Sequence, residues 1–170
     1  NLIAGLLVRM AAALHEATKP GGRLLASGIF VDREPEVRRA LAAAGFHVMR
    51  LHYDGTGESV GATDDDPGRV DAWLESVRRA AAAMAAIPGV ESVGLIGVRI
   101  GAAFALETST RIDVSHLVLW EPSAGAFYSR EMEILASSSP QRVPGGVVAA
   151  GYWLSLQTMA DLGKLDLEKM

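Results

Sequence analysis

The chain has 170 residues, of which 49% are hydrophobic and 21% are charged, as expected of one soluble globular domain with a substantial core. The formal net charge of −4 disfavours nucleic-acid binding, because a phosphate-binding surface needs clustered lysine and arginine. The absence of cysteine excludes disulfides and thiolate metal sites, and it is compatible with a cytoplasmic location. No apolar run reaches the roughly 18–20 residues that span a membrane.

Helical and strand patterns alternate along the first 122 residues. In chain order, the predicted elements are a helix from Asn1 that "KPGG" (19–22) ends, a strand over 23–30, a helix from Asp32 or Glu34 to Ala44, a strand over 46–53, a helix over 64–86, a strand over 91–97, a helix over 99–109 and a strand over 115–122. Gly45 is the predicted residue after the second helix. The chain starts directly in a helical pattern without methionine, as expected of a fragment or an excised segment.

The regular alternation ends after Pro122. Residues 136–151 are rich in Ser, Pro and Gly, which predicts a loop. The amphipathic stretch 153–167 predicts a helix. We therefore expect residues 123–170 to form a lid-like loop and a C-terminal helix.

The alternation predicts the class of fold. Strands that alternate with helices of about 10–20 residues favour parallel βαβ units with right-handed crossovers. Strands that are apolar throughout are typical of a sheet with helices on both faces. The expected architecture is a single three-layer α/β/α domain over residues 1–170, with an open, mostly parallel sheet of about four strands.

Three motifs near the N-terminus resemble one enzyme family. They are "NLIAG" (1–5), "KPGG" (19–22) before a strand ending in "SGI" (27–29), and a helix that ends in "AAGF" (43–46). Residues 1–48 thus resemble the C-terminal part of the ribosomal-protein lysine methyltransferases, which are S-adenosylmethionine-dependent and Rossmann-like. The resemblance implies that Asn1 corresponds to an Asn beside the cofactor. It also implies that the glycine-rich cofactor loop lies upstream of residue 1, so that this chain binds no cofactor.

The rest of the chain is similar to a different family. The segments are "AAGFHVMRLHYDGTGESVG" (43–61), "GLIGVRIGAAFA" (94–105), "LVLWEPSAGAFYSREM" (117–132) and "AGYWLSLQTMADLGKLDL" (150–167). They resemble α/β-hydrolases of the serine-aminopeptidase or exosortase-associated kind. Residues 97–101 correspond to the nucleophile elbow G-x-S-x-G, with Arg99 in place of the serine. The resemblance implies that the acid and histidine of the triad are missing.

The two resemblances overlap at "ALAAAGFHV" (40–48) and favour a chimera, natural or engineered. It would combine a methyltransferase-like segment 1–48, a hydrolase-like core 49–122 and the segment 123–170; a single divergent family is the alternative. The function predicted on this basis is that of a pseudoenzyme without catalytic residues. Two alternatives stay open: a hydrolase-like protein completed by a partner chain or a second copy, and an anion-binding module centred on Arg99.

A ligand crevice is expected where parallel strands end. If the strands follow the hydrolase order 2-1-3-4, it lies at the carboxyl ends of strands one and three. The residues expected to line it are Phe30, Asp32, Tyr53, Asp54, Val98 and Arg99. Arg99 lies at a helix N-terminus and could hold an anion, although pairing with a carboxylate such as Glu121 or Asp54 is the alternative.

Two further segments could bind small ions. The loop "DGTGES" (54–59) could cradle a phosphate, but a lone G-x-G without lysine is more typical of a tight loop. The acidic run 64–66 could bind a cation, but such a run before a helix is more typical of a solvated cap. We therefore expect no metal site, and neither a nucleic acid nor a membrane as partner.

Overall fold

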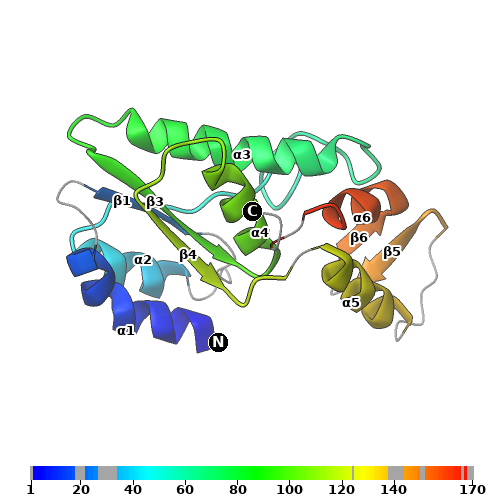
Figure 1. The fold of residues 1–170 in the computed structure, drawn as a ribbon, viewed down its shortest axis with the longest axis horizontal. Coiled ribbons are helices and arrows are strands. Elements are labelled where there is room, and N and C mark those ends of the chain that lie inside the picture. The colour runs from blue at the N-terminus through cyan, green and yellow to red at the C-terminus, as the bar shows by residue number, and fades with distance from the viewer. Residues whose placement is uncertain are drawn as a thin grey trace.

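The computed structural model describes residues 2–17, 22–26, 34–123, 125–137, 144–149, 152–165 and 167 (Figure 1). The helices are α1 (Leu2–Ala17), α2 (Glu34–Ala43), α3 (Arg69–Ala85), α4 (Ile100–Ser109), α5 (Gly125–Ser137) and α6 (Leu156–Leu162). The strands are β1 (Gly22–Ala26), β2 (Val48–Met49), β3 (Ser92–Val98), β4 (His116–Trp120), β5 (Gly146–Ala149) and β6 (Tyr152–Ser155). Within the described residues, no helix combines the length and the apolar character that crossing a bilayer requires.

The first four strands form one parallel sheet in the order β2-β1-β3-β4. In the middle of the sheet, Leu25 lies opposite Leu95, and Leu95 lies opposite Leu117. Because all four strands run in the same direction, their carboxyl ends meet at one edge, called the carboxyl edge below. The prediction of a mixed α/β fold with a parallel sheet is confirmed.

Helices cover both faces of this sheet. On β3, Leu95 packs into a core with α3 and α4, whereas Ile96 packs into a second core with α1 and α2. The same alternation on β4 directs Leu119 to the first core and Val118 to the second. Figure 1 shows α3 along one side of the sheet and α1 and α2 along the other. The alternation has period two because successive side chains of a strand point to opposite faces.

The end of α2 has the geometry that the sequence predicts. Gly45 has a φ of +98°, and its N–H donates to the carbonyl of Ala42 at 3.0 Å. The N–H of Phe46 donates to the carbonyl of Leu41, also at 3.0 Å. These two bonds form a Schellman motif, in which glycine accepts the left-handed conformation without steric cost.

Two predicted elements differ from the structure in the first half of the chain. The strand predicted over 46–53 is reduced to β2, because β2 is an edge strand that pairs with only two residues of β1. The chain then leaves the sheet, and Tyr53 packs against α3. The helix predicted from residue 64 begins at Arg69, after a run of turns.

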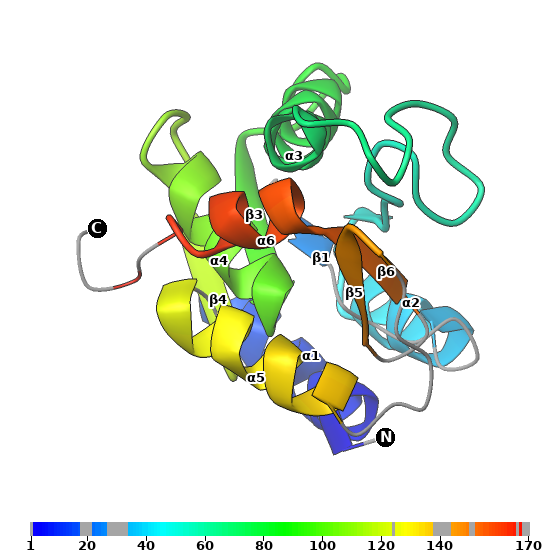
Figure 2. The same cartoon turned by 90° about the vertical axis from the view of Figure 1, so that its right-hand side faces the viewer.

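The segment 123–170 contains more regular structure than predicted. Residues 125–137 form α5, and β5 pairs with β6 as an antiparallel hairpin. Residues 153–155 belong to β6, because the hydroxyl of Ser155 accepts from the N–H of Thr158 and starts α6 only there. We call α5, the hairpin and α6 the C-terminal unit; Figures 1 and 2 show it at one end of the molecule, next to the carboxyl edge. The predicted loop over 136–151 lies partly outside the described residues.

Candidate functional site

The carboxyl edge contains a sharp turn between β3 and α4. Arg99 lies between the two elements with φ 54° and ψ −120°, and its N–H donates to the carbonyl of Trp120 at 2.9 Å. Glu121 follows the neighbouring strand β4 and has a φ of 44°. Within the described residues, these are the non-glycine residues with a positive φ. Such backbone strain persists only where the surrounding structure enforces it, and it is concentrated at functional sites.

Gly97 allows β3 and α4 to approach closely at this turn. A Cβ atom at this position would lie 2.3 Å from the carbonyl oxygen of Gly101 and 2.4 Å from the Cα of Ala102. Both are backbone atoms that cannot move without moving the helix. Gly97 of "GVRIG" is therefore a packing requirement, and the turn has the strand-to-helix form that the sequence predicts.

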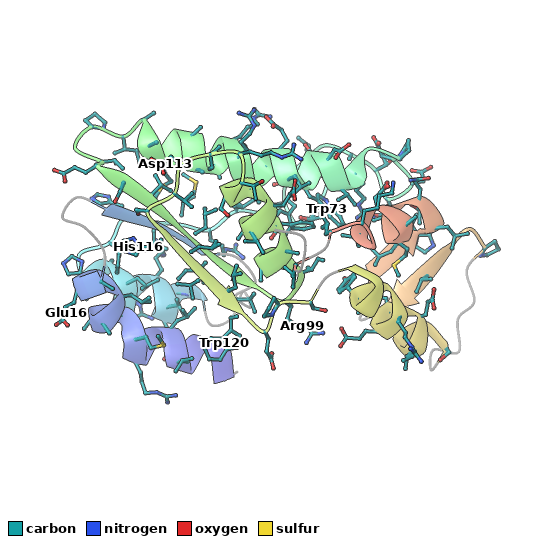
Figure 3. All side chains as sticks on the ribbon, viewed as in Figure 1. Glu16, Trp73, Arg99, Asp113, His116 and Trp120 are labelled. Carbon is teal, nitrogen blue, oxygen red and sulfur yellow. The ribbon has the colours of Figure 1, made fainter. Side chains whose placement is uncertain are left out.

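The guanidinium of Arg99 is paired with a carboxylate. Its Nη2 lies 2.8 Å from Oε1 of Glu131 on α5. The hydroxyl of the buried Ser123 donates to Oε2 of the same carboxylate at 3.2 Å. The partner is thus Glu131, where the sequence suggested Glu121 or Asp54. Both oxygens of Glu131 are thus engaged, and the ion pair lies at the surface, with 47% of the Arg99 side chain and 32% of the Glu131 side chain exposed. Figure 3 shows Arg99 on the side of the C-terminal unit.

Tyr128 of α5 lies in the electrostatic field of this pair. Burial raises the pKa of Tyr128; the charge of Arg99 opposes this shift, and the charge of Glu131 adds to it. The phenol therefore stays protonated at neutral pH.

The predicted crevice residues are engaged in separate parts of the structure. The ring of Tyr53 contacts the rings of Trp73 and Phe104, with centroids at 6.1 and 5.2 Å. Asp54 accepts the indole N–H of Trp73 on its carbonyl at 3.0 Å and the N–H of Ala62 on its carboxylate. These contacts are made with α3, with α4 and with the loop before α3, whereas the guanidinium of Arg99 contacts α5.

The remaining predicted crevice residues are Val98, Phe30 and Asp32. Val98 is buried, with 4% of its surface exposed. Phe30 and Asp32 lie outside the described residues. The grouping of all six residues around one ligand stays a prediction.

The polar groups of the loop 54–59 bond to the residues immediately before it. The hydroxyl of Thr56 donates to the carbonyl of Tyr53, and the hydroxyl of Ser59 donates to the carbonyl of His52. The N–H of Glu58 donates to Nδ1 of His52 at 3.0 Å, which assigns the ring proton to Nε2. Because its polar groups bond to Tyr53 and His52, this segment is organised as a tight turn.

The acidic run 64–66 is also engaged locally. Asp64 forms an ion pair with Arg69. The hydroxyl of Thr63 donates to Asp65 at 2.7 Å, and this bond lowers the pKa of Asp65. Among the described residues, no three His, Asp or Glu side chains are grouped as metal ligands.

Sequence reasoning missed Arg69. This side chain is only 3% exposed, and its Nη1 donates at 3.3 Å both to the carbonyl of Asp64 and to that of Trp153 in β6. Its guanidinium also lies 4.8 Å from the ring centroid of Trp73, within the range of a cation–π contact. Arg69 therefore connects α3 to the C-terminal unit. The spacing of Arg69 and Trp73, one helical turn apart, was the available signal.

The strain at Arg99 leads to a prediction. Arg99→Gly and Arg99→Ala both remove the ion pair with Glu131, but only glycine relieves the positive φ. We expect the glycine variant to exceed the alanine variant by about 1 kcal/mol in free energy of unfolding, measured in urea. At the exposed helical position Arg78, the same two substitutions should rank in the opposite order by about 1 kcal/mol. Equal stability of the two Arg99 variants would contradict the strain.

Comparison with known proteins gives a match at the N-terminus. Residues 1–59 match the family model described as "Ribosomal protein L11 methyltransferase (PrmA)". The Ribosomal protein L11 methyltransferase of Chloroflexus aurantiacus is 47% identical over 55 residues, which are 32% of this chain and 17% of the relative. That of Thermus thermophilus is 46% identical over 55 residues, which are 32% of this chain and 22% of the relative. The chain thus spans less than a quarter of the length of these relatives.

These matches correct the function predicted from the sequence. The interpretation as an inactive, natural or engineered chimera with a hydrolase-like half is wrong, because the relatives are methyltransferases. The two alternatives, a hydrolase completed by another chain and an anion-binding module at Arg99, are overturned with it. Over α1 to the loop after β2, the chain is similar to ribosomal protein L11 methyltransferases.

Proposed function

We propose that this chain acts in S-adenosylmethionine-dependent methyl transfer to a ribosomal protein, with residues 1–59 as its methyltransferase-like unit. The match of this unit to the ribosomal protein L11 methyltransferases is the observation that carries the proposal. A ribosomal protein is then the partner, and a cytoplasmic location follows from where ribosomes are assembled.

The packing of the N-terminal unit supports this proposal. The core between α1, α2 and the sheet contains Leu7, Val37, Leu41 and Phe46, all 4% exposed or less. The N-terminal unit, residues 1–59, also supplies β1 and β2 to the sheet. The strand order reverses between β1 and β3, which pair with each other. In open α/β sheets, ligands bind beside such a reversal, at the carboxyl ends of the strands.

The residues described at the carboxyl edge beside the strand reversal do not by themselves fit S-adenosylmethionine; the exposed Glu121 follows β4, one strand away from the reversal. A nucleoside cofactor in such a sheet needs a free acidic side chain for its ribose hydroxyls. Asp54 is bonded to the N–H of Ala62, and Glu131 is bonded to Arg99 and Ser123. We therefore assign no catalytic step to these carboxylates, and the proposal depends on the match of residues 1–59.

The test is methylation of purified ribosomal protein L11 by the full chain. With tritiated S-adenosylmethionine, we expect label in L11 that increases with time and with the concentration of the chain. The Thermus thermophilus relative serves as the positive control, and heat-denatured chain serves as the negative control. Titration calorimetry with S-adenosylmethionine measures cofactor binding independently. Labelling no higher than with denatured chain, while the positive control is active, would refute the proposed function.

A further inference from the structure

β4 is the outer strand on one side of the sheet. In the order β2-β1-β3-β4 it pairs with β3, and no further described strand lies beyond it. The carbonyl of Trp120 accepts the N–H of Arg99 at 2.9 Å, on the side of β3. Because successive residues of a strand direct their backbone groups to alternate sides, Leu117 and Leu119 direct their N–H and C=O groups to the open side. These groups have no partner among the described residues.

The exposure of β4 lies along this open side. All residues of β4 are half-buried, whereas β3 is buried from Val93 to Val98. Both faces of β4 are packed, since Leu117 and Leu119 contact the first core and Val118 contacts the second. β4 is therefore packed like an inner strand but lacks a second neighbouring strand.

β4 also lacks the features that protect edge strands from pairing. Such strands are usually very short, or they carry lysine, proline or a bulge. The opposite edge of the sheet follows this rule, because β2 pairs with β1 through Val48 and Met49 alone. β4 is five residues long, and its sequence HLVLW contains no proline and no lysine, arginine, aspartate or glutamate. Valine and tryptophan are among the residues that favour strands. The open side of β4 is thus suited to accept another strand.

We propose that β4 pairs with β4 of a second copy of this chain, antiparallel and about a two-fold axis at Val118. Leu117 would lie opposite Leu119 of the second copy, and the two residues would exchange both backbone hydrogen bonds. The two-fold axis repeats this pair, so that the outward groups of both leucines are bonded in both copies. The two four-stranded sheets would then form one continuous sheet.

The side chains of β4 complement one another in this register. Because side chains alternate along a strand, His116, Val118 and Trp120 share one face. Figure 3 shows His116 and Trp120 at opposite ends of β4, so each would lie opposite the other residue of the second copy. Glu121 follows β4, and antiparallel pairing places the two Glu121 carboxylates far apart, whereas parallel pairing would place them side by side. Aromatic cross-strand pairs stabilise a sheet and adjacent like charges destabilise it, so both features favour the antiparallel dimer.

The test is sedimentation velocity on the full chain over a hundredfold range of concentration. We expect a reversible equilibrium between monomer and dimer, in which the dimer dissociates on dilution. Amide hydrogen exchange provides an independent measure, because the N–H groups of Leu117 and Leu119 should exchange more slowly as the fraction of dimer increases. A chain that is monomeric over the whole range overturns the proposal.

Two variants test the register of the pairing. His116 and Trp120 belong to neither of the two cores, so their replacement should leave the fold intact. Trp120→Lys and His116→Glu should each raise the dissociation constant of the dimer about tenfold, since each dimer contains the change twice. A mixture of the two variants should form more dimer than either variant alone, because the introduced lysine then lies opposite the introduced glutamate.

A matched control separates the pairing from a general charge effect. Ala83→Lys, at an exposed position of α3, adds the same charge as Trp120→Lys and should leave the dissociation constant unchanged. A dimer that Trp120→Lys leaves intact, or a mixture that forms no more dimer than the separate variants, overturns the pairing through β4. Failure of methylation leaves this inference intact, because β4 lies outside residues 1–59.

Discussion

Replacing Phe104 with alanine is expected to lower the free energy of unfolding by about 3–5 kcal/mol. Phe104 is 1% exposed and lies in the core beneath α3. Its ring meets the ring of Tyr53 edge-on, with centroids at 5.2 Å, and that of Trp73 at 5.9 Å. The substitution therefore removes apolar surface from α3, from α4 and from the loop after β2 at once. The cavity that remains cannot collapse easily, because three separate segments form its walls.

Urea unfolding followed by circular dichroism measures this loss. Val60→Ala is the control, since Val60 is 93% exposed and its truncation should change the free energy of unfolding by less than about 0.5 kcal/mol. A loss below about 1 kcal/mol for Phe104→Ala would mean that the aromatic cluster does not support the core. Retained secondary structure with lost cooperativity would instead indicate loosened packing.

Gly97→Ala is expected to destabilise the protein by about 1–3 kcal/mol or more, since overpacked positions force the backbone to shift. The new methyl group would overlap with the backbone of Gly101 and Ala102, at 2.3 and 2.4 Å. Relief requires α4 to move away from β3, which would disturb the Arg99 turn as well. The effect should therefore appear both in the midpoint of urea unfolding and in faster amide hydrogen exchange at the start of α4.

Gly5→Ala provides the matched control. Gly5 lies inside α1, and a Cβ atom there would meet nothing within 4 Å. Alanine at this position should raise the free energy of unfolding by about 0.5–1 kcal/mol, because glycine loses more backbone entropy in a helix. Replacing glycine with alanine should thus lower the free energy of unfolding at Gly97 and raise it at Gly5. A stabilising Gly97→Ala would contradict the close contact of β3 and α4.

The elements that depend on local pattern were predictable from sequence. The alternation of apolar strands with amphipathic helices predicts the parallel sheet, and Gly45 predicts the end of α2. "GVRIG" predicts the sharp turn after β3. Each of these features depends on residues within a few positions of one another.

The features that were missed depend on residues distant in sequence. Trp153–Ser155 reads as the start of an amphipathic helix, but its pairing with β5 and the bond from Arg69 hold it extended. Glu131 as the partner of Arg99 depends on where α5 packs, which no local pattern specifies.

The family resemblance of the N-terminal segment was confirmed, whereas the function predicted for the chain was wrong. The motifs "NLIAG", "KPGG" and "AAGF" led to the methyltransferases, and residues 1–59 match that family. The turn at Arg99 led to the hydrolases, because glycines at a strand-to-helix turn satisfy a packing requirement that several folds share. A close backbone approach is thus a poor guide to chemistry when the side chain at its apex is already paired.

The strand order of the sheet also affects how the chain behaves during synthesis. β1 lies inside the sheet, but its pairing with β3 begins only where Gly22 meets Ser92. At about 5–20 residues added per second, several seconds pass before the ribosome supplies that partner. A nascent chain that ends between β2 and β3 holds β1 with one edge open, which can pair with another chain. Co-translational aggregation, and therefore the yield of folded protein, should depend on how well chaperones cover the open edge of β1 until β3 has been synthesised.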